Sequence, residues 1–374
     1  MTGPDRIAVA LVSDSIYPYF RGGKEIRYHE IARRLADRAD VTVYTMQWWD
    51  GPRSHVADGV RFRALCGLQE LYRNGRRSVR QSLVFSFAAL RLLRGRFDVI
   101  EADTVPYPQI FALKLVALVR RRRLVVTWYE IWDREQWRTQ LGWLGPLGAV
   151  LGRIAFLLPD EIVAISPAAV PEIRRRARRS TRIHLAGGGI DLDALRAVPA
   201  AAAGPDVLYV GRLIEHKGVG LLLDALALLR RRGVELETLI VGRGPQADEL
   251  RADAERLGVG DLVTFRHDIA SNDEVYGLMK ASRVFAAPST REGFGVAVLE
   301  ALACGVPVVT TDHPENMARL LVESAGAGRL CAPDAAALAD ALVGAADDDA
   351  RAGEQWLRGH DWDAVADRVL EAYR

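Results

Sequence analysis

The chain has 374 residues, of which 49% are hydrophobic and 26% are charged, a globular composition with room for two domains. No apolar run approaches the roughly 20 residues of a membrane-spanning helix, and residues 1–6 do not have the layout of a signal peptide. Cys66, Cys304 and Cys331 are far apart and lack CxxC spacing. They argue against a disulfide framework or a zinc site and fit a reducing cytoplasm.

The formal net charge of +2 conceals an uneven distribution, because residues 1–185 carry 31 Lys and Arg against 18 Asp and Glu. Arg73, Arg76, Arg77 and Arg80 lead into the apolar run 83–90. Such a basic amphipathic helix fits either peripheral contact with an anionic membrane or a core-facing helix with a solvated arginine face. No aromatic-interleaved basic strand or recognition helix accompanies the charge, so nucleic acid is not an expected partner.

The first half of the chain alternates short apolar strands with helical patterns, which is typical of parallel α/β sheets. The helix signal is clearest at residues 25–38, which contain the apolar residues Ile26, Ile31 and Leu35. The predicted strands are 7–12, 41–45, 60–64, 98–101, 124–127, 161–165 and 182–185, and two further helices are predicted at 109–119 and 145–157.

The second half restarts the same pattern. Its predicted strands are 207–210, 238–241, 262–265, 284–287 and 305–311, and its predicted helices are 221–231, 245–257, 273–281 and 335–345. The recurrence predicts an α/β protein of two Rossmann-like parallel-sheet domains facing each other across a cleft.

The best candidate for a linker follows the glycines at 187–189 and includes the Ala-, Pro- and Gly-rich residues 197–205. We therefore expect an N-terminal domain over residues 1–189, a linker over 190–205 and a C-terminal domain over 206–358. Residues 359–374 read as an amphipathic terminal helix with an Asp N-cap. We expect that helix to pack back on the N-terminal domain.

The most informative segment is residues 291–300, where Glu292 and Glu300 flank a Gly-Phe-Gly turn. Gly293 and Gly295 let the backbone approach a ligand and free N–H groups at a helix N-terminus, which is an anion site. The carboxylates can bind hydroxyls of the molecule that carries the anion, and a nucleotide sugar has both groups. Exposed glutamates near a helix start are also common, but the flanking strands put this segment where doubly wound folds bind ligands.

Two other loops that follow strands offer ligands for a diphosphate. Arg212 and Lys217 leave the end of strand 207–210, and two cations there can neutralise a departing diphosphate. Backbone N–H groups around Gly23, in the pair Gly22-Gly23, would point at an oxyanion. A solvated loop and an ordinary turn are the alternatives for these two segments.

Together these segments resemble the family-4 glycosyltransferases of the GT-B fold over essentially the full chain. The resemblance is carried by Gly22-Gly23, by Gly211-Arg212 with Lys217-Gly218, and by residues 288–309. It implies retaining transfer of a sugar from a nucleoside diphosphate, with UDP or GDP expected, to a hydroxyl acceptor. It also implies that cationic side chains replace a metal, so no metal or other cofactor is expected.

The resemblance implies that residues 1–189 form the acceptor-side domain and residues 206–358 the nucleotide-sugar-binding domain, and it carries roles over to individual residues. Arg212 and Lys217 would hold the diphosphate, Glu292 the hydroxyls of the donor sugar and Glu300 the ribose diol. Gly242 would let the donor approach closely, and the base would lie near residues 267–269. The further donor-binding residues are Gly22, Gly23, Gly211, His267, Ile269, Phe294, Gly295 and Val296.

Tyr129 stands where the family commonly has a histidine near the reacting sugar. A tyrosine can donate one hydrogen bond but is a poor proton acceptor at neutral pH. Either histidine is not essential to this chemistry, or Tyr129 supplies its hydrogen bond, or the activity is weak or absent. Glu130, Tyr17 and Trp132 are candidates for acceptor binding, with loop capping and core packing as the alternatives.

Two other functions stay open: a GT-B nucleotide-sugar epimerase and a non-catalytic nucleotide-sugar-binding protein. The sequence identifies neither the base, the sugar, the acceptor nor the oligomeric state. Its arginine- and alanine-rich composition is typical of GC-rich bacteria. We expect a cytoplasmic location, with peripheral contact at the inner membrane face as an alternative that stays open with the two interpretations of the basic helix.

Overall fold

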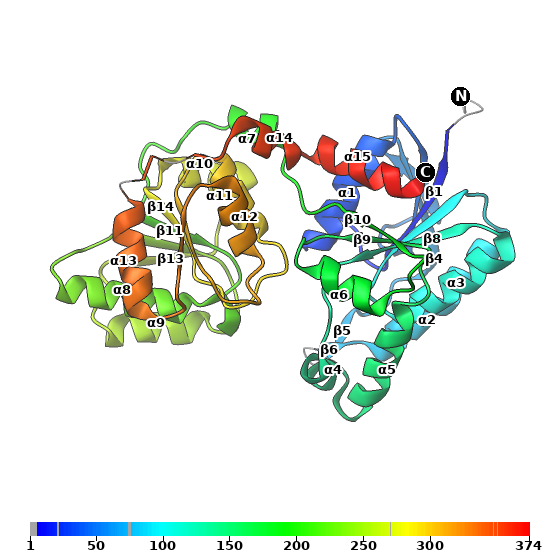
Figure 1. The fold of residues 1–374 in the computed structure, drawn as a ribbon, viewed down its shortest axis with the longest axis horizontal. Coiled ribbons are helices and arrows are strands. Elements are labelled where there is room, and N and C mark those ends of the chain that lie inside the picture. Colours follow the sequence, from blue (N-terminus) through cyan, green and yellow to red (C-terminus); the bar gives the residue numbers. More distant parts are fainter. Residues whose placement is uncertain (1–5, 21, 74–75, 270, 347, 350) are drawn as a thin grey trace. The chain divides into compact units, whose positions relative to one another are not determined.

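The computed structural model describes residues 6–20, 22–73, 76–269, 271–346, 348–349 and 351–374. The chain divides into two compact units (Figure 1). Unit 1 holds the chain up to Gly188 together with Trp362–Arg374, and unit 2 holds Gly189–Asp361.

Unit 1 is built on one sheet with the strand order β10-β9-β8-β7-β1-β2-β4-β3. All neighbours are parallel except β3 and β4, which form an antiparallel hairpin at the edge. The strands are β1 (Ala8–Val12), β2 (Asp40–Gln47), β3 (Ser54–Ala57), β4 (Val60–Gly67), β7 (Val99–Asp103), β8 (Arg123–Trp128), β9 (Glu161–Ala164) and β10 (Arg182–Leu185). A separate two-stranded ribbon joins β5 (Tyr72–Arg73) to β6 (Arg76–Arg77).

The helices of unit 1 cover both faces of its sheet (Figure 1). One core contains buried side chains of α1 (Gly23–Leu35) and α15 (Trp362–Tyr373). The other contains buried side chains of α2 (Val79–Ala89), α3 (Pro108–Arg120), α5 (Gly145–Ala155) and α6 (Ala169–Arg176). Unit 1 also contains α4 (Arg134–Leu141) and the 3-10 helices η1 (Leu90–Arg94) and η2 (Gly142–Leu144).

Unit 2 has a parallel six-stranded sheet with the order β13-β12-β11-β14-β15-β16. The strands are β11 (Val207–Val210), β12 (Thr238–Val241), β13 (Val263–Arg266), β14 (Val284–Ala287), β15 (Val308–Thr311) and β16 (Arg329–Cys331). The order turns around at the β11–β14 pair, because the chain runs outward from β11 to β13 and then returns to the other side of β11. Open α/β sheets bind ligands outside the carboxyl ends of the strands at such a point.

Helices pack on both faces of this second sheet as well. One core contains side chains of α8 (Val219–Arg231), α9 (Ala247–Arg256) and α13 (Ala335–Ala345). The other contains side chains of α7 (Leu192–Ala197), α10 (Asn272–Ala281), α11 (Val296–Ala303), α12 (Ala318–Ala325) and α14 (Glu354–Gly359). None of the helices in the described residues is long and apolar enough to cross a bilayer.

The structure differs from the expected domain boundaries at the linker. Residues 190–205 were expected to connect two domains, but they include α7, whose Leu192 and Leu195 are buried. Asp191 caps this helix by accepting a hydrogen bond from the Ala194 N–H. Buried leucines hold the segment in unit 2. The terminal helix α15 belongs to unit 1, where it packs on α1.

Candidate functional site

The candidate site in unit 2 is formed by the loops that leave β11 and β14, the two strands at the turning point of the sheet. The first loop contains Arg212 and the short 3-10 helix η3 (Glu215–Lys217). The second runs from Pro288 to Gly295 and opens α11. Because both strands are parallel neighbours, their carboxyl ends bring the two loops together.

Gly218 makes this close approach possible. Its φ of 71° lies in the left-handed region, and a Cβ there would come within 2.1 Å of the Pro288 carbonyl oxygen. The Thr290 N–H also donates to the His216 carbonyl at 2.9 Å. Only glycine combines this backbone angle with this contact, so the residue fixes the spacing between the two loops.

Lys217 and Glu292 form an ion pair across the two loops. The backbone of Glu292 is held on both sides: its N–H donates to Glu315 at 3.0 Å, and its carbonyl accepts from the Met317 N–H at 3.0 Å. Both side chains are partly exposed, at 20% for Lys217 and 23% for Glu292. The structure therefore brings together two residues predicted from separate segments and leaves both accessible to a ligand.

The N-terminus of α11 follows directly after this pair. Gly295 is its N-cap with a φ of 93°, and a Cβ at Gly295 would lie 2.5 Å from the Cβ of Ala318. The N–H groups of the first helical turn have no acceptor within the helix. Phe294 packs against the core while Val296 is exposed. Anion binding at this helix start stays a prediction.

Positive charge surrounds the first loop. The exposed Arg212 guanidinium forms no ion pair with any residue in the described ranges, and Arg291 Nη2 lies 3.5 Å from His216 Nδ1. Burial lowers the pKa of His216, and Arg291, Lys217 and Arg212 lower it further. These three cations therefore all act on the His216 imidazole. No role for Arg291 or His216 was predicted from the sequence.

Glu300 lies on α11 and accepts a hydrogen bond from the Tyr276 hydroxyl of α10 at 3.0 Å. Burial raises the pKa of Glu300 to about 7, although the bond from Tyr276 acts in the opposite direction. One carboxylate oxygen, Oε1, is thus occupied by tyrosine. No motif signalled Tyr276, because its partner is determined by the packing of α10 against α11.

Other predicted donor residues lie on neighbouring loops. A Cβ at Gly242 would come within 1.9 Å of the Gly211 carbonyl oxygen, so packing between two loops already requires glycine there without a ligand. The exposed His267 has a carbonyl that accepts two hydrogen bonds from Arg243, at 3.0 and 2.7 Å. Ile269 packs against the core. Among the described residues, no group of three or more His, Cys, Asp or Glu is arranged to hold a metal.

In unit 1, Gly22 is the N-cap of α1 and Gly23 is its first residue. The next residue, Lys24, turns into the protein and pairs with Asp14 at 3.0 Å and Asp103 at 2.9 Å. Both carboxylates are fully buried: Asp14 follows the carboxyl end of β1, and Asp103 is the last residue of β7. This buried ion cluster was not predicted from the sequence. It holds the start of α1, and with it the glycine pair, at the carboxyl ends of the central strands β1 and β7.

Tyr129 directly follows β8, but its hydroxyl is buried and has no hydrogen-bond partner among the described residues. Its ring centroid lies 5.9 Å from Arg27 Cζ. Burial raises the pKa of Tyr129, and Asp103 and Glu101 raise it further against the opposing effect of Arg27. Tyr129 is thus unsuited to accept a proton, and hydrogen-bond donation or packing stay as its possible roles.

Two of the three acceptor-side candidates contact each other. Trp132 Nε1 donates to Glu130 Oε2 at 3.2 Å, and the Trp132 ring lies 4.9 Å from that of Trp137. The remaining candidate, Tyr17, lies 4.9 Å from the ring of His29. Trp132 also lines a small cavity of about 190 Å³, together with Tyr107, Trp137, Phe156, Arg134 and Arg176.

Solved structures with the same architecture identify the fold. Sucrose-phosphate synthase from Thermosynechococcus elongatus aligns with a TM-score of 0.75 at 21% identity and covers 99% of this chain and 98% of that chain. Anabaena HepE, solved in complex with UDP-glucose, aligns with a TM-score of 0.69 at 21% identity over 98% of this chain and 99% of that chain. The protein therefore has the GT-B fold of two parallel-sheet α/β units.

Two family models together span most of the sequence. The model described as glycosyltransferase family 4 matches residues 21–194, and the model of glycosyl transferases group 1 matches residues 192–355. The chain belongs to the family-4 glycosyltransferases.

Among curated relatives, phosphatidyl-myo-inositol mannosyltransferase of Mycobacterium leprae is 33% identical over 235 residues. This alignment covers 58% of the chain and 61% of that protein. The GDP-mannose-dependent alpha-(1-6)-phosphatidylinositol monomannoside mannosyltransferase of Mycobacterium tuberculosis is 34% identical over 215 residues, which is 50% of the chain and 54% of that protein. The chain thus matches less than two thirds of the length of these relatives.

Proposed function

We propose that this protein is a retaining glycosyltransferase that needs no metal ion and moves a sugar from a nucleoside diphosphate to a hydroxyl acceptor. The observation that carries the proposal is the Lys217–Glu292 ion pair at the turning point of the unit 2 sheet. It joins a cation suited to a diphosphate and a carboxylate suited to sugar hydroxyls within one contact.

The roles follow from the charges. Arg212 and Lys217 neutralise the diphosphate as it departs, and the N–H groups at the start of α11 support the same charge. Glu292 accepts hydrogen bonds from hydroxyls of the donor sugar, and Glu300 accepts them from the ribose diol. These cations do the work that a bound metal ion does in other phosphate sites.

No group in the proposed donor site acts as a nucleophile. The acceptor oxygen forms a bond to the anomeric carbon, the bond from that carbon to the diphosphate oxygen breaks, and a diphosphate oxygen takes the acceptor proton on the same face. The configuration is then retained, and the protein contributes orientation and electrostatic stabilisation. Tyr129 serves at most as a hydrogen-bond donor in this scheme, because its raised pKa excludes it as a base.

The relatives indicate which substrates to test first. One is named as GDP-mannose-dependent and two are named for transfer to phosphatidylinositol lipids, whereas HepE was solved with UDP-glucose. We therefore propose GDP- and UDP-sugars as donors and include inositol lipids among the acceptors. The cytoplasmic location stays a prediction.

A transfer assay tests the proposal. The protein is incubated with each donor and a panel of acceptors in the presence of EDTA, and the released nucleoside diphosphate is measured. We expect release that depends on the acceptor, a product whose anomeric configuration by NMR matches the donor, and strong loss of both in Glu292→Gln. Interconversion of the donor without an acceptor would instead indicate an epimerase, and nucleotide binding without any product a non-catalytic binding protein.

A further inference from the structure

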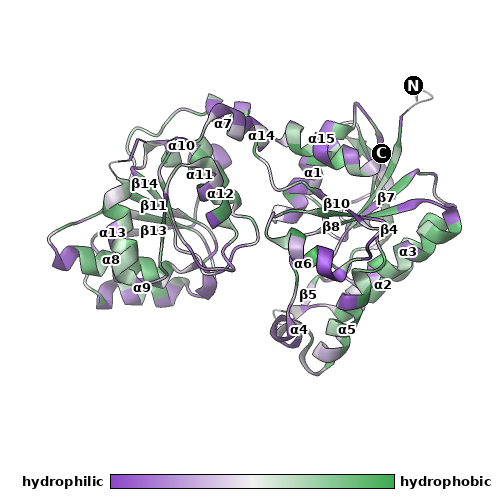
Figure 2. Ribbon diagram, in the orientation of Figure 1, coloured by the Kyte–Doolittle hydropathy of each residue, from purple (hydrophilic) through white to green (hydrophobic). Residues whose placement is uncertain are grey.

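Three helices on one face of the unit 1 sheet, α2, α3 and α5, expose large apolar side chains. Phe87 of α2 is 71% exposed, Leu118 of α3 is 64% exposed and Leu147 of α5 is 56% exposed. Figure 2 colours most of these three helices as hydrophobic. Because their buried residues already form the core below, the exposed residues are additional to what the fold needs.

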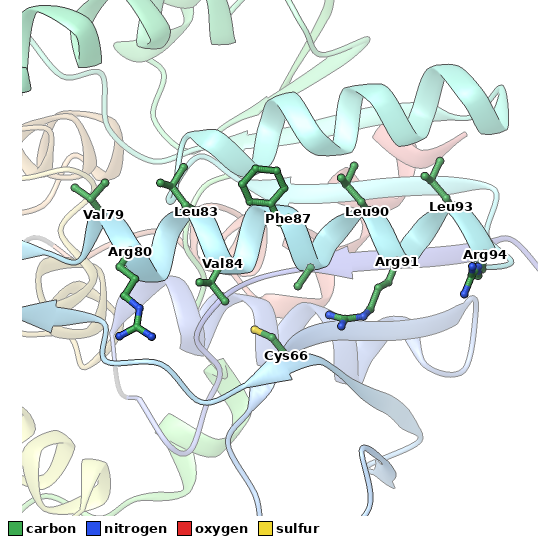
Figure 3. A pocket seen from close by; sticks show the side chains of 11 residues that line it. Cys66, Val79, Arg80, Leu83, Val84, Phe87, Leu90, Arg91, Leu93 and Arg94 are labelled. Carbon is green, nitrogen blue, oxygen red and sulfur yellow. The ribbon is translucent and has the colours of Figure 1, made fainter.

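The exposed residues of α2 and η1 line a groove of about 1140 Å³ (Figure 3). Val79, Leu83 and Phe87 follow one edge of the helix, at a spacing of four residues, and the apolar row continues through η1. Arg80, Arg91 and Arg94 follow the other edge. The helix therefore presents an apolar stripe with a row of arginines beside it.

The charged side chains of these three helices are all positive. No Asp or Glu stands between Glu70 and Asp98, between Asp103 and Glu130, or between Glu135 and Asp160, and these stretches contain α2, α3 and α5 respectively. Exposed arginines follow α3 at positions 121 and 122. We call the exposed side of α2, η1, α3 and α5 the basic apolar face.

The basic apolar face differs from the helix that the sequence suggested. Arg77 was expected to belong to it, but its guanidinium pairs with the buried Asp14 at 3.2 Å. The side chains of Arg73 and Arg76 lie outside the described part of the structure. The cations beside the apolar stripe are therefore those at 80, 91 and 94, from the helix itself.

We propose that the basic apolar face docks on the surface of an anionic lipid membrane. Leu83 and Phe87 enter the boundary between head groups and acyl chains, while Arg80 and Arg94 pair with lipid phosphates, as in interfacial amphipathic helices. A second copy of the chain fits this face less well. A two-fold interface would place the same acid-free, arginine-rich patch against itself.

This inference is independent of the donor site, because every residue that carries it lies in unit 1. Flotation of the full chain with vesicles tests it, using phosphatidylcholine alone and phosphatidylcholine mixed with phosphatidylglycerol. We expect binding to the mixed vesicles at low salt and much weaker binding at high salt or to neutral vesicles. The exposed positions allow variants that leave the core intact.

The pair Leu83→Ser and Phe87→Ser, and the pair Arg80→Glu and Arg94→Glu, should each weaken binding to mixed vesicles at least about tenfold. The matched controls are Val56→Ser, which is 66% exposed on β3, and Arg231→Glu, exposed on α8 of unit 2. They should bind as the unaltered chain does, and circular dichroism should confirm that all variants fold.

Equal flotation of the unaltered chain and both pairs of variants would overturn the proposal, as would no binding to mixed vesicles at low salt. Analytical sedimentation of the unaltered chain and of the variants measures the oligomeric state and tests the alternative occupant. If the unaltered chain is a dimer and Leu83→Ser with Phe87→Ser makes it a monomer, the face belongs to a second copy instead.

Discussion

Lys217 and Glu292 neutralise each other in the unliganded protein. The pair is about one-fifth exposed at each end, so its contribution to folding stability is small. A nucleotide sugar offers each partner a replacement: the diphosphate for the lysine and the hydroxyls for the carboxylate. The two residues should therefore respond differently to substitution.

Glu292→Gln should lower turnover about a hundredfold, a loss typical of one transition-state contact, without weakening the affinity for the free nucleoside diphosphate. The amide no longer competes with the diphosphate for Lys217, and the free nucleotide has no sugar to lose. Lys217→Met should instead weaken that affinity by about 1.5–3 kcal/mol, as expected for a charged hydrogen bond. Titration calorimetry with the nucleotide and a turnover assay separate the two effects, and matching losses in both variants would contradict these roles.

Glu300 predicts a pH dependence. Its pKa is about 7 in the folded protein against an ordinary value of 4.5, so the folded state retains a proton that the unfolded chain releases between these values. The free energy of unfolding should therefore fall as the pH rises from about 4.5 to 7, by at most about 3.4 kcal/mol. Glu300→Gln should remove this slope in denaturant titrations, and an unchanged slope would show that Glu300 titrates normally.

The same proton affects the ligand. Only an ionised carboxylate accepts hydrogen bonds through both oxygens, so nucleotide binding should strengthen between about pH 6 and 8. Tyr276→Phe removes the bond to Oε1 and should raise the pH at which affinity reaches its plateau. An affinity that does not change with pH would argue against a ribose diol at Glu300.

At the residue level, sequence reasoning succeeded where chemistry is concentrated in a few consecutive positions. Lys217 and Glu292 were predicted from separate loops, and parallel strand pairing explains why they meet. Tyr276 and the ion pairs of Lys24 were missed because they depend on tertiary packing between elements far apart in sequence. Gly242 has a packing role that the sequence did not reveal, since a Cβ there would meet the Gly211 carbonyl oxygen, and its approach to a donor stays a prediction.

Among the elements, the start of α1 depends most on buried charge. Lys24 lies between Asp14 and Asp103, and Asp14 also pairs with Arg77. Lys24→Met should leave Asp103 without its cation and destabilise unit 1 by about 3 kcal/mol, because breaking a buried pair leaves an uncompensated charge.

Tryptophan fluorescence can follow this loss, because seven of the eight tryptophans belong to unit 1. Arg175→Met is the matched control: its side chain is 75% exposed and pairs with Glu172 one turn away on α6. It should change the free energy of unfolding by less than about 0.5 kcal/mol. If Lys24→Met unfolds like the control, the cluster does not anchor α1.

Element prediction was most accurate for strands buried on both faces. The ranges 207–210, 238–241 and 284–287 coincide with β11, β12 and β14, since strands beneath helices leave continuous apolar runs. The range 182–185 also coincides with β10, although Arg182 and Leu185 of this edge strand are exposed. β3 was missed because three of its four residues are exposed. The turn between β3 and β4 is Asp58-Gly59, with φ of 51° and 74°. An Asp-Gly pair is typical of two-residue hairpin turns, so this hairpin was predictable from the sequence.

At the level of the whole molecule, the sequence predicted two Rossmann-like units because a strand–helix alternation restarts after residue 205. The predicted end of the first domain at residue 189 lies one residue from the boundary after Gly188. The sequence did not show that residues 190–205 belong to unit 2, since α7 is held there by two buried leucines rather than by a composition that marks it. The uneven charge of the two halves also has a structural counterpart. Part of the basic excess lies on the basic apolar face of unit 1, and part neutralises buried carboxylates.

The most direct test of the proposed donor site is titration of the full chain, and of its Lys217→Met variant, with GDP and UDP in the presence of EDTA. We predict that at least one of the two nucleotides binds the unaltered chain without metal and that Lys217→Met weakens this binding at least about tenfold. If neither nucleotide binds, or if Lys217→Met binds as tightly as the unaltered chain, the loops that follow β11 and β14 do not form the donor site.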